Sequence, residues 1–444
     1  MRADSRHHAF FKSGTAVVLT VGALWGALLL LRIGGAGSFT SVSIREINAH
    51  GHAQIFGWVG LFVLGASYAI LPRLLGTALA YPRLAGASGV LLLAGVIVRS
   101  IAEPLSVHAP FLVLALAAAA AEIVAAFLFA FVLIAMMRRR ATREPADAYI
   151  VAGALFFVAQ AVYEAVLLGL IGTAGTRQEL IARIGTYQAP LRDLQIHGFA
   201  LLMILGMTQR YLVPAYSFPR ISRRRSIICL AAIIAAVVGE GGGLIAFRTT
   251  GESAYAGVMG VSVLVLAGAV AALVLPWRLY DPPRIWDPSL KYVRAGYTWL
   301  GISLAMLLFM PVYLRLTGQP FSHAYYGAAR HAVTVGFVSL MIMGVAARAV
   351  GGASGRWNLG TLRLPFALIN IGCALRVLLQ AATDFAPAAF RLVGVSGLIE
   401  VSGLALWSVQ LWRAMHEHES AHAQERPESV TMIQQRVSVS GGAD

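Results

Sequence analysis

Charged residues are scarce in this chain of 444 residues. Asp, Glu, Lys and Arg make up 12% of it, whereas 58% of the residues are hydrophobic and the mean hydropathy is +0.73. A soluble domain carries about 25% charged residues. The composition therefore argues against a soluble globular protein and predicts an integral membrane protein.

Cysteine is nearly absent as well. The chain has two, Cys229 and Cys373, and both lie inside apolar runs. Paired or closely spaced cysteines are the usual signature of a disulfide or of a thiolate metal site. The sequence indicates neither.

Acidic residues are outnumbered, with 20 Asp and Glu against 35 Lys and Arg and a net charge of +15. Their distribution argues against nucleic acid as a partner. With the N-terminus in the cytoplasm, 24 of the 35 basic residues fall on the inner side and 11 on the outer side. This is the bias of the positive-inside rule. We therefore interpret runs such as Arg138 to Arg140 as anchors at the bilayer surface and expect both termini in the cytoplasm.

Long apolar runs recur along the whole chain, and a spanning helix needs roughly 20 such residues. The expected fold class is an all-α integral membrane protein with about twelve transmembrane helices. The first span shows no cleavage site that would mark a signal peptide. Residues 1–415 should form one membrane domain, and the polar tail 416–444 should be disordered in the cytoplasm. The expected spans are 14–35, 50–72, 84–101, 109–137, 147–172, 194–214, 226–248, 254–278, 294–316, 331–350, 362–383 and 390–414.

Six of the eleven histidines are expected at one depth, near the outer ends of even-numbered spans. Histidine in a membrane is costly unless it is paired, hydrated or bound, and imidazole is the commonest metal ligand among side chains. The shared depth favours a common site over histidines that only face lipid headgroups. The six are His50, His52, His108, His197, His323 and His331.

An internal similarity links the second, sixth and tenth spans. Arg45–Gly51 resembles Arg192–Gly198, and His52–Gly65 resembles His331–Gly344. Binding sites in membrane proteins with repeats often lie where the repeats meet. We expect three pseudo-repeated four-helix units that bring the histidine-bearing helices together; chance similarity of Gly-rich segments is the alternative. The units would span roughly 14–137, 147–278 and 294–414.

This histidine set suits haem and a second metal. Imidazoles from opposing helices can ligate a haem iron axially, and others can hold copper or non-haem iron without cysteine. We assign His50, His52 and His331 to the haem, with His331 and His52 as the favoured axial pair. His197 and His323 are assigned to the second metal.

Arginines and glutamates extend the predicted site. Arg45, Arg192 and Arg330 lie near the histidines and could pair with haem propionates, or they are ordinary loop residues. Carboxylates inside spans are functional candidates by default because burying them is costly. Glu240, followed by three glycines, is the favoured catalytic group, as a metal ligand or in a proton path. Helix packing is the alternative role for it and for Glu122, Glu164 and Glu400.

Seven motifs stand out along the chain: His50-Gly-His52-Ala, Gly206-Met-Thr-Gln-Arg210-Tyr-Leu-Val-Pro214, His331-Ala-Val-Thr-Val-Gly336, Met343-Gly-Val-Ala-Ala-Arg348, Leu364-Pro365, Ala374-Leu-Arg376-Val and Ser402-Gly-Leu-Ala-Leu-Trp407. Together they resemble the NnrS family of bacterial membrane proteins. The resemblance covers nearly the whole chain and implies an inner-membrane protein with haem and copper, tied to nitric oxide metabolism and nitrosative stress. The second span departs from the family's His-Ala-His-Glu pattern, because Ala53 and Gln54 follow His52 here.

The chain is also distantly similar to the catalytic subunit of haem–copper oxidases. That fold has twelve spans, three-fold pseudo-symmetry and haem ligands on its second and tenth spans. The seventh span here has no histidine pair, and the sixth has no His-Pro-x-x-Tyr motif. The oxygen-reducing copper centre of that family is therefore not expected.

Together these features predict a b-type haem protein of the bacterial inner membrane with its site near the periplasmic face. It would handle nitric oxide or another small gas, either as a nitric oxide reductase-like oxidoreductase or by protective binding. Reduction would need a periplasmic electron donor. The alternative is a membrane transporter in which the histidines and buried glutamates bind substrate or protons.

Overall fold

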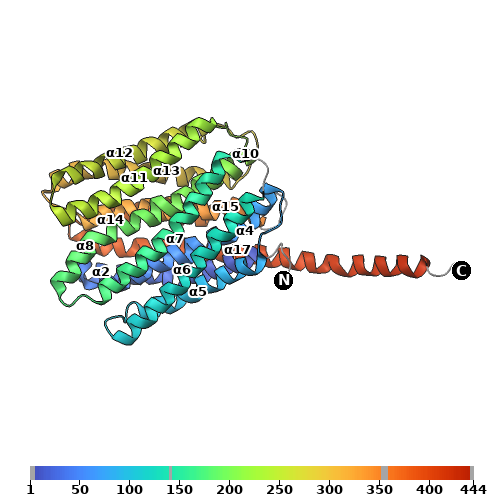
Figure 1. The fold of residues 1–444 in the computed structure, drawn as a ribbon, viewed down its shortest axis with the longest axis horizontal. Coiled ribbons are helices and arrows are strands. Elements are labelled where there is room, and N and C mark those ends of the chain that lie inside the picture. The colour runs from blue at the N-terminus through green and yellow to red at the C-terminus, as the bar shows by residue number, and fades with distance from the viewer. Residues whose placement is uncertain (1–5, 140–142, 352–358, 441–444) are drawn as a thin grey trace.

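Twelve helices in the computed structural model are long and apolar enough to cross a membrane, which confirms the expected number. The structure describes residues 6–139, 143–351 and 359–440, and within these ranges every regular element is helical. The helices lie side by side in one bundle (Figure 1).

The first span comprises α1 (Arg6–Val17), η2 (Val18–Gly22) and α2 (Ala23–Ala36), and the second comprises α3 (Ile44–His52), η4 (Ala53–Gly60) and α4 (Leu61–Leu75). The third, fourth and fifth spans are the single helices α5 (Pro82–Ala102), α6 (Ala109–Arg138) and α7 (Pro145–Gly172). The sixth span comprises α8 (Arg177–Asp193), η5 (Leu194–Leu201), α9 (Leu202–Met207), η6 (Thr208–Leu212) and α10 (Val213–Ala215). The seventh span is α11 (Arg223–Thr250), the eighth is α12 (Ser253–Val274) with η7 (Leu275–Trp277), and the ninth is α13 (Leu290–Thr317). The tenth span comprises α14 (His323–His331), η8 (Ala332–Ser339) and α15 (Leu340–Gly351). The eleventh span is α16 (Arg363–Ala382), and the twelfth is formed by α17 (Ala388–Ser440).

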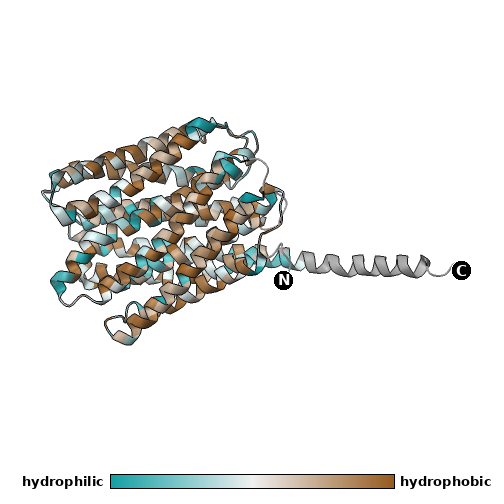
Figure 2. Cartoon of the chain, in the orientation of Figure 1, coloured by the Kyte–Doolittle hydropathy of each residue, from teal (hydrophilic) through white to brown (hydrophobic). Residues whose placement is uncertain are grey.

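The outer helices carry the apolar surface that a bilayer requires. Figure 2 shows hydrophobic ribbon along much of the bundle and hydrophilic ribbon in several connecting loops. On α12, for example, Val261 and Leu264 are about 60% exposed. Because exposed apolar area of this extent is rare on soluble monomers, the surface indicates a bilayer as the environment.

The second, sixth and tenth spans begin earlier than hydropathy predicts. They start at Ile44, Arg177 and His323 rather than near 50, 194 and 331. Their first turns are polar but helical, and side-chain caps begin them: Ser43 with Glu46 in a capping box, Thr176 and Ser322. Capping residues of this kind satisfy the first N–H groups of a helix. His50, His197 and His331 therefore lie at least one turn inside their helices, not at the start.

These same three spans form the centre of the bundle. Between 72% and 83% of each apolar window is buried, whereas no other span exceeds 50%. The amide of Gln188 donates to Asn48 Oδ1 at 2.7 Å, joining the sixth span to the second, and Trp58 Nε1 donates to Ser339 Oγ at 3.1 Å, joining the second to the tenth. η5 packs against η8. Consecutive spans alternate in direction, so all three begin at one end of the bundle, here called the histidine end.

Each central span contains one π-helical segment of eight residues, η4, η5 and η8. Such segments are rare and often mark functional sites. The fifth residue of each is a glycine, Gly57, Gly198 or Gly336, and eight residues further each span has another, Gly65, Gly206 or Gly344. Added Cβ atoms at all six would contact side chains of the span just before: the first, fifth or ninth.

The register of the π-helical segments corrects one detail of the repeat. Aligned on their glycines, the segments place Asp193, not His197, opposite His52 and His331. Arg45–Gly51 and Arg192–Gly198 are therefore out of register by six residues. The three-unit organisation stays a prediction, which the matched segments and glycines favour.

The C-terminal tail continues as helix. α17 runs from the bundle to Ser440 and extends well beyond it (Figure 1). The segment that we expected to be disordered, 416–444, is thus helical up to Ser440, and 441–444 lie outside the described residues.

Gly206→Ala should destabilise the bundle. The added Cβ would lie 3.0 Å from the backbone nitrogen of Ile150 and 2.7 Å from its Cγ1. Overpacking of this kind costs about 1–3 kcal/mol, so the midpoint of thermal unfolding in detergent should fall. Gly260→Ala on α12 is the matched control, because an added Cβ there meets nothing within 4 Å. Equal midpoints for the two variants would contradict the close packing of the fifth and sixth spans.

Candidate metal and cofactor site

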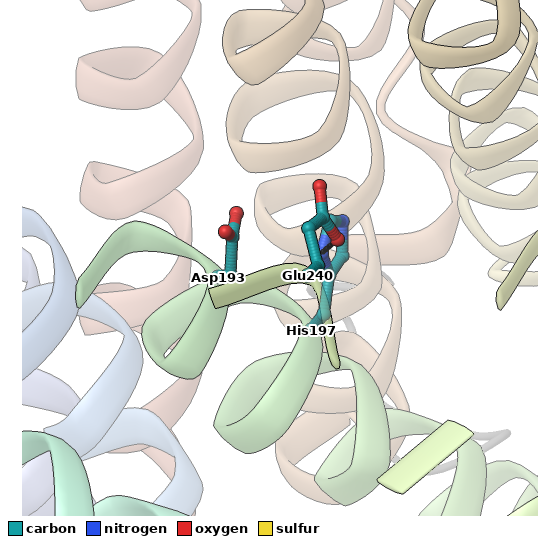
Figure 3. Close-up of side chains that lie close together, drawn as sticks. All are labelled: Asp193, His197 and Glu240. Carbon is teal, nitrogen blue, oxygen red and sulfur yellow. Dashed lines mark ion pairs between the residues drawn. The ribbon is translucent and has the colours of Figure 1, made fainter. Parts of the chain in front are cut away.

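Three side chains converge near the histidine end on a point that could hold a metal ion. Asp193, His197 and Glu240 each offer a ligand atom, and these atoms all lie within 4.8 Å of one another (Figure 3). All three residues are buried, with 7%, 4% and 9% of their total surface exposed. His197 Nδ1 lies 3.8 Å from Glu240 Oε2, beyond hydrogen-bond distance.

The local sequence explains this convergence. Asp193 ends α8 and His197 follows four residues later in η5, so one helical stretch carries both. Glu240 comes from α11, where its glycine neighbours allow close packing. A Cβ on Gly241 would lie 3.3 Å from Pro190 Cβ of α8, and one on Gly239 would overlap Ser262 Oγ of α12. Because Gly241 has no side chain, α11 can lie close to the sixth span, which brings Glu240 next to Asp193 and His197.

The donor set fits a metal. His197 Nδ1 and Glu240 Oε2 are buried and have no hydrogen-bond partner among the described residues. Unsatisfied buried polar atoms cost free energy and call for an explanation such as an ion. One imidazole and two carboxylates form a mixed nitrogen and oxygen set without sulfur. Such a set suits iron, manganese or zinc better than copper(I).

Arg330 lies beside this group. Its guanidinium stacks on the Tyr326 ring at 3.9 Å and donates to the Tyr326 hydroxyl at 2.7 Å. It is also close enough to Asp193, His197 and Glu240 to interact with each electrostatically. This cation offsets the negative charge of the two carboxylates. The structure therefore places Arg330 at the candidate metal site.

A second pair of imidazoles, His50 and His331, lies nearby. His50 Nδ1 is 2.9 Å from the carbonyl oxygen of Gly22, and His331 Nδ1 is 3.1 Å from that of Gly327. A carbonyl only accepts, so each Nδ1 donates and each Nε2 is left as the basic nitrogen. Neither Nε2 has a hydrogen-bond partner among the described residues. The two rings are close enough to interact electrostatically.

The first span is shaped to receive His50. Its π-helical turn η2 ends at Gly22, whose ψ of −111° departs from helical geometry and leaves the carbonyl free to accept. A Cβ on Gly26, one turn later, would lie 2.8 Å from two nitrogens of the His50 ring. The absence of a side chain at Gly26 thus lets the His50 ring lie against this helix.

His52 has a different environment. Its Nε2 lies 2.8 Å from Glu122 Oε1 and its Nδ1 lies 3.3 Å from Glu164 Oε1. Arg99 donates to Glu164 at 3.0 Å and to Glu103 at 2.8 Å. All five side chains are nearly inaccessible. Both ring nitrogens of His52 are therefore held by carboxylates, and neither is free to bind a metal in this arrangement.

This carboxylate cluster connects to the sixth span. Gln195 Nε2 donates to Glu164 Oε2 at 2.9 Å, and Arg192 donates to Gln195 Oε1 at 2.7 Å. Gln195 lies two residues from both Asp193 and His197. Hydrogen bonds thus extend from His52 to the helix that carries the candidate metal ligands.

The remaining sequence-predicted residues lie elsewhere. His323 is the first residue of α14 and is exposed, with its ring against Phe321, and His108 is an exposed helix cap. Arg45 is half-buried on α3, where its Nε has no partner among the described residues. Sequence reasoning missed Asp193 because it lies just outside the apolar run that starts at 194. The alignment of Asp193 with His52 and His331 in the internal repeat was the feature of the sequence that could have identified it.

Glu240→Gln should lower the content of non-haem metal. Removing a residue that hydrogen-bonds to a metal ligand lowers the metal affinity about 10–100-fold. Removing a ligand itself should lower the affinity at least as much. We expect metal per protein, measured by elemental analysis after dialysis, to fall at least tenfold while haem content is unchanged. The control is Glu252→Gln, the same change at an exposed helix cap. Full metal content in Glu240→Gln would remove Glu240 from the site.

Comparison with known proteins assigns the chain to a family. No curated protein matches it. The sequence profile described as NnrS protein matches residues 5–418, which covers every span and confirms the resemblance seen in the motifs. The chain belongs to the NnrS family.

Proposed function

We propose that this membrane protein binds haem and a second metal and handles nitric oxide. Family membership supports the general role. The observation that carries the proposal is the pair His50 and His331, each with Nδ1 bonded to a carbonyl and Nε2 unpartnered. A carbonyl partner on Nδ1 is the usual arrangement of a histidine that ligates a metal through Nε2.

Haem would be held by His50 and His331, from the second and tenth spans. The pair differs from the His52 and His331 pair that the sequence favoured, because His52 is engaged by Glu122 and Glu164. The two cysteines lie far apart in sequence, so a haem would not be attached covalently through a C-x-x-C-H motif. A b-type haem held by both imidazoles would supply an iron centre for electron transfer, and nitric oxide would then bind at the second metal.

The second metal would be held by Asp193, His197 and Glu240. Their oxygen and nitrogen ligands favour non-haem iron over copper. Glu240 then acts as a ligand, which was one of the two roles expected for it. His323, exposed at the start of α14, is not needed for this set.

The same site would support either of two activities, reduction of nitric oxide or its protective binding. Reduction of two nitric oxide molecules consumes two electrons and two protons and yields nitrous oxide and water. The electrons would come from a periplasmic donor. The buried polar chain from Glu164 through Gln195 offers groups that could pass protons toward His197. Protective binding of the gas needs neither electrons nor protons.

The transporter alternative has less support. Transporter sites are commonly formed where helices are broken near the midplane of the membrane. Here the second, sixth and tenth spans continue as helix past every candidate residue. Their π-helical segments shift side chains without breaking the helix.

Orientation in the membrane gives one prediction. If the protein lies in the inner membrane with both termini in the cytoplasm, the loop after α6 is cytoplasmic and the histidine end faces the periplasm. The positive-inside bias of the loops supports this. Reporter fusions after Arg138 should be active on the cytoplasmic side, and fusions in the loop before α14 on the periplasmic side. The opposite result would place the site at the cytoplasmic face.

Replacing either proposed haem ligand should change the haem spectrum. His331→Ala and His50→Ala should each lose the six-coordinate, low-spin spectrum of a bis-imidazole haem, or lose the haem, because one axial nitrogen is removed. Absorption and paramagnetic resonance spectra of purified protein measure this. His108→Ala, at an exposed helix cap, is the control and should be unchanged. Full haem content and an unaltered spectrum in His331→Ala would refute the assignment.

A further inference from the structure

One deeply buried arginine makes no hydrogen bond to any residue that the structure describes. Arg376 of α16 is 6% exposed, and its Nε and Nη1 are both buried and unbonded among the described residues. The comparably buried Arg99 and Arg192 both donate to side-chain oxygens. An unpaired charge inside a membrane protein is strongly unfavourable and commonly marks a functional site.

The nearest carboxylate does not pair with it directly. Glu400 of α17 interacts electrostatically with Arg376, but no hydrogen bond or ion pair joins the two side chains. Its Oε1 is also buried and unbonded. Glu400 therefore offsets part of the charge and leaves the guanidinium donors of Arg376 free for another acceptor.

Arg376 lies beside the proposed haem ligands. Its charge acts on both His50 and His331. α16 packs against α14, and Cys373, three residues before Arg376, places its Sγ 3.7 Å from the His331 carbonyl oxygen. One turn after Arg376, Gln380 packs against Gly327, whose carbonyl bonds the His331 ring. The same stretch of α16 thus adjoins the His331 turn, and Arg376 is its charged residue.

We propose that Arg376 binds a carboxylate of the ligand held between His50 and His331. If that ligand is haem, as the proposed function states, the carboxylate is a propionate. A guanidinium presents paired N–H donors that match a carboxylate, and burial strengthens the contact. Arg376 lies six residues before the end of α16 that belongs to the histidine end of the bundle.

This assignment adds to the arginines expected from the sequence. Arg330 is engaged with Tyr326 at the Asp193, His197 and Glu240 group, and Arg192 donates to Gln195. Arg376 differs from both because it makes no hydrogen bond within the described residues. It is therefore the buried cation at the histidine pair that has donors to offer.

Reconstitution with two forms of haem tests the proposal. Apo-protein is titrated with haem and with haem dimethyl ester, in which both propionates are neutral. Because a hydrogen bond to a charged group contributes enough for about a tenfold difference in affinity or more, wild type should bind haem at least about tenfold more tightly than the ester. Arg376→Gln should lose this preference. Arg363→Gln, the same change at an exposed position of α16, should keep it.

Further arms separate the outcomes. Arg376→Lys retains a charge without the paired donors, so its preference should be intermediate; it also serves as the test if Arg376→Gln does not fold. An unchanged preference in folded Arg376 variants overturns the proposal and leaves the histidine assignment intact. A wild type that binds neither form overturns the proposed function as well. If acetate stabilises wild-type apo-protein but not Arg376→Gln, and haem is not preferred over its ester, the site takes a free carboxylate and the propionate assignment is wrong.

Discussion

The cost of burying polar groups away from water is the constraint on which this structure depends. Nine outer spans cover three inner ones, and both sets bury polar groups where they face one another. The polar first turns of the inner spans are helical because the side chains of Ser43, Thr176 and Ser322 cap their first N–H groups. Glycines such as Gly206 let the preceding span approach closely enough to complete this cover.

The buried polar groups fall into two classes. His52, Glu122, Glu164 and Arg99 satisfy one another and join the second span to its neighbours. A cluster of that kind is stable without a ligand. Other groups have atoms without a hydrogen-bond partner among the described residues: His197 Nδ1, Glu240 Oε2, Arg376 Nε and Nη1, and the Nε2 atoms of His50 and His331. Their common position near the histidine end indicates that ligands complete them. Haem and a metal ion would do so with the donor types present.

Much of this arrangement could be predicted from sequence. Hydropathy identified all twelve spans, and the rarity of histidine in apolar segments pointed to the second, sixth and tenth. The predicted starts of the second and sixth helices were less accurate. Hydropathy detects runs of apolar residues, whereas Ile44–Asn48 and Arg177–Asp193 contain many polar ones. The sequence could not predict which side chains form hydrogen bonds with each histidine. Whether His50 or His52 is free depends on Glu122 and Glu164, which lie 70 and 112 residues from His52 in the chain. Arg376 belongs to one of the sequence motifs, yet only the fold shows that it makes no hydrogen bond with the described residues.

The central claim is that His50 and His331 together ligate a haem iron. The most direct measurement is the low-temperature paramagnetic resonance spectrum of the oxidised, purified wild-type protein, recorded with its haem content. The account predicts at least one haem per chain with the low-spin signal of two imidazole ligands. A preparation that is folded and exposed to haem, yet contains none or shows only another coordination, would contradict it.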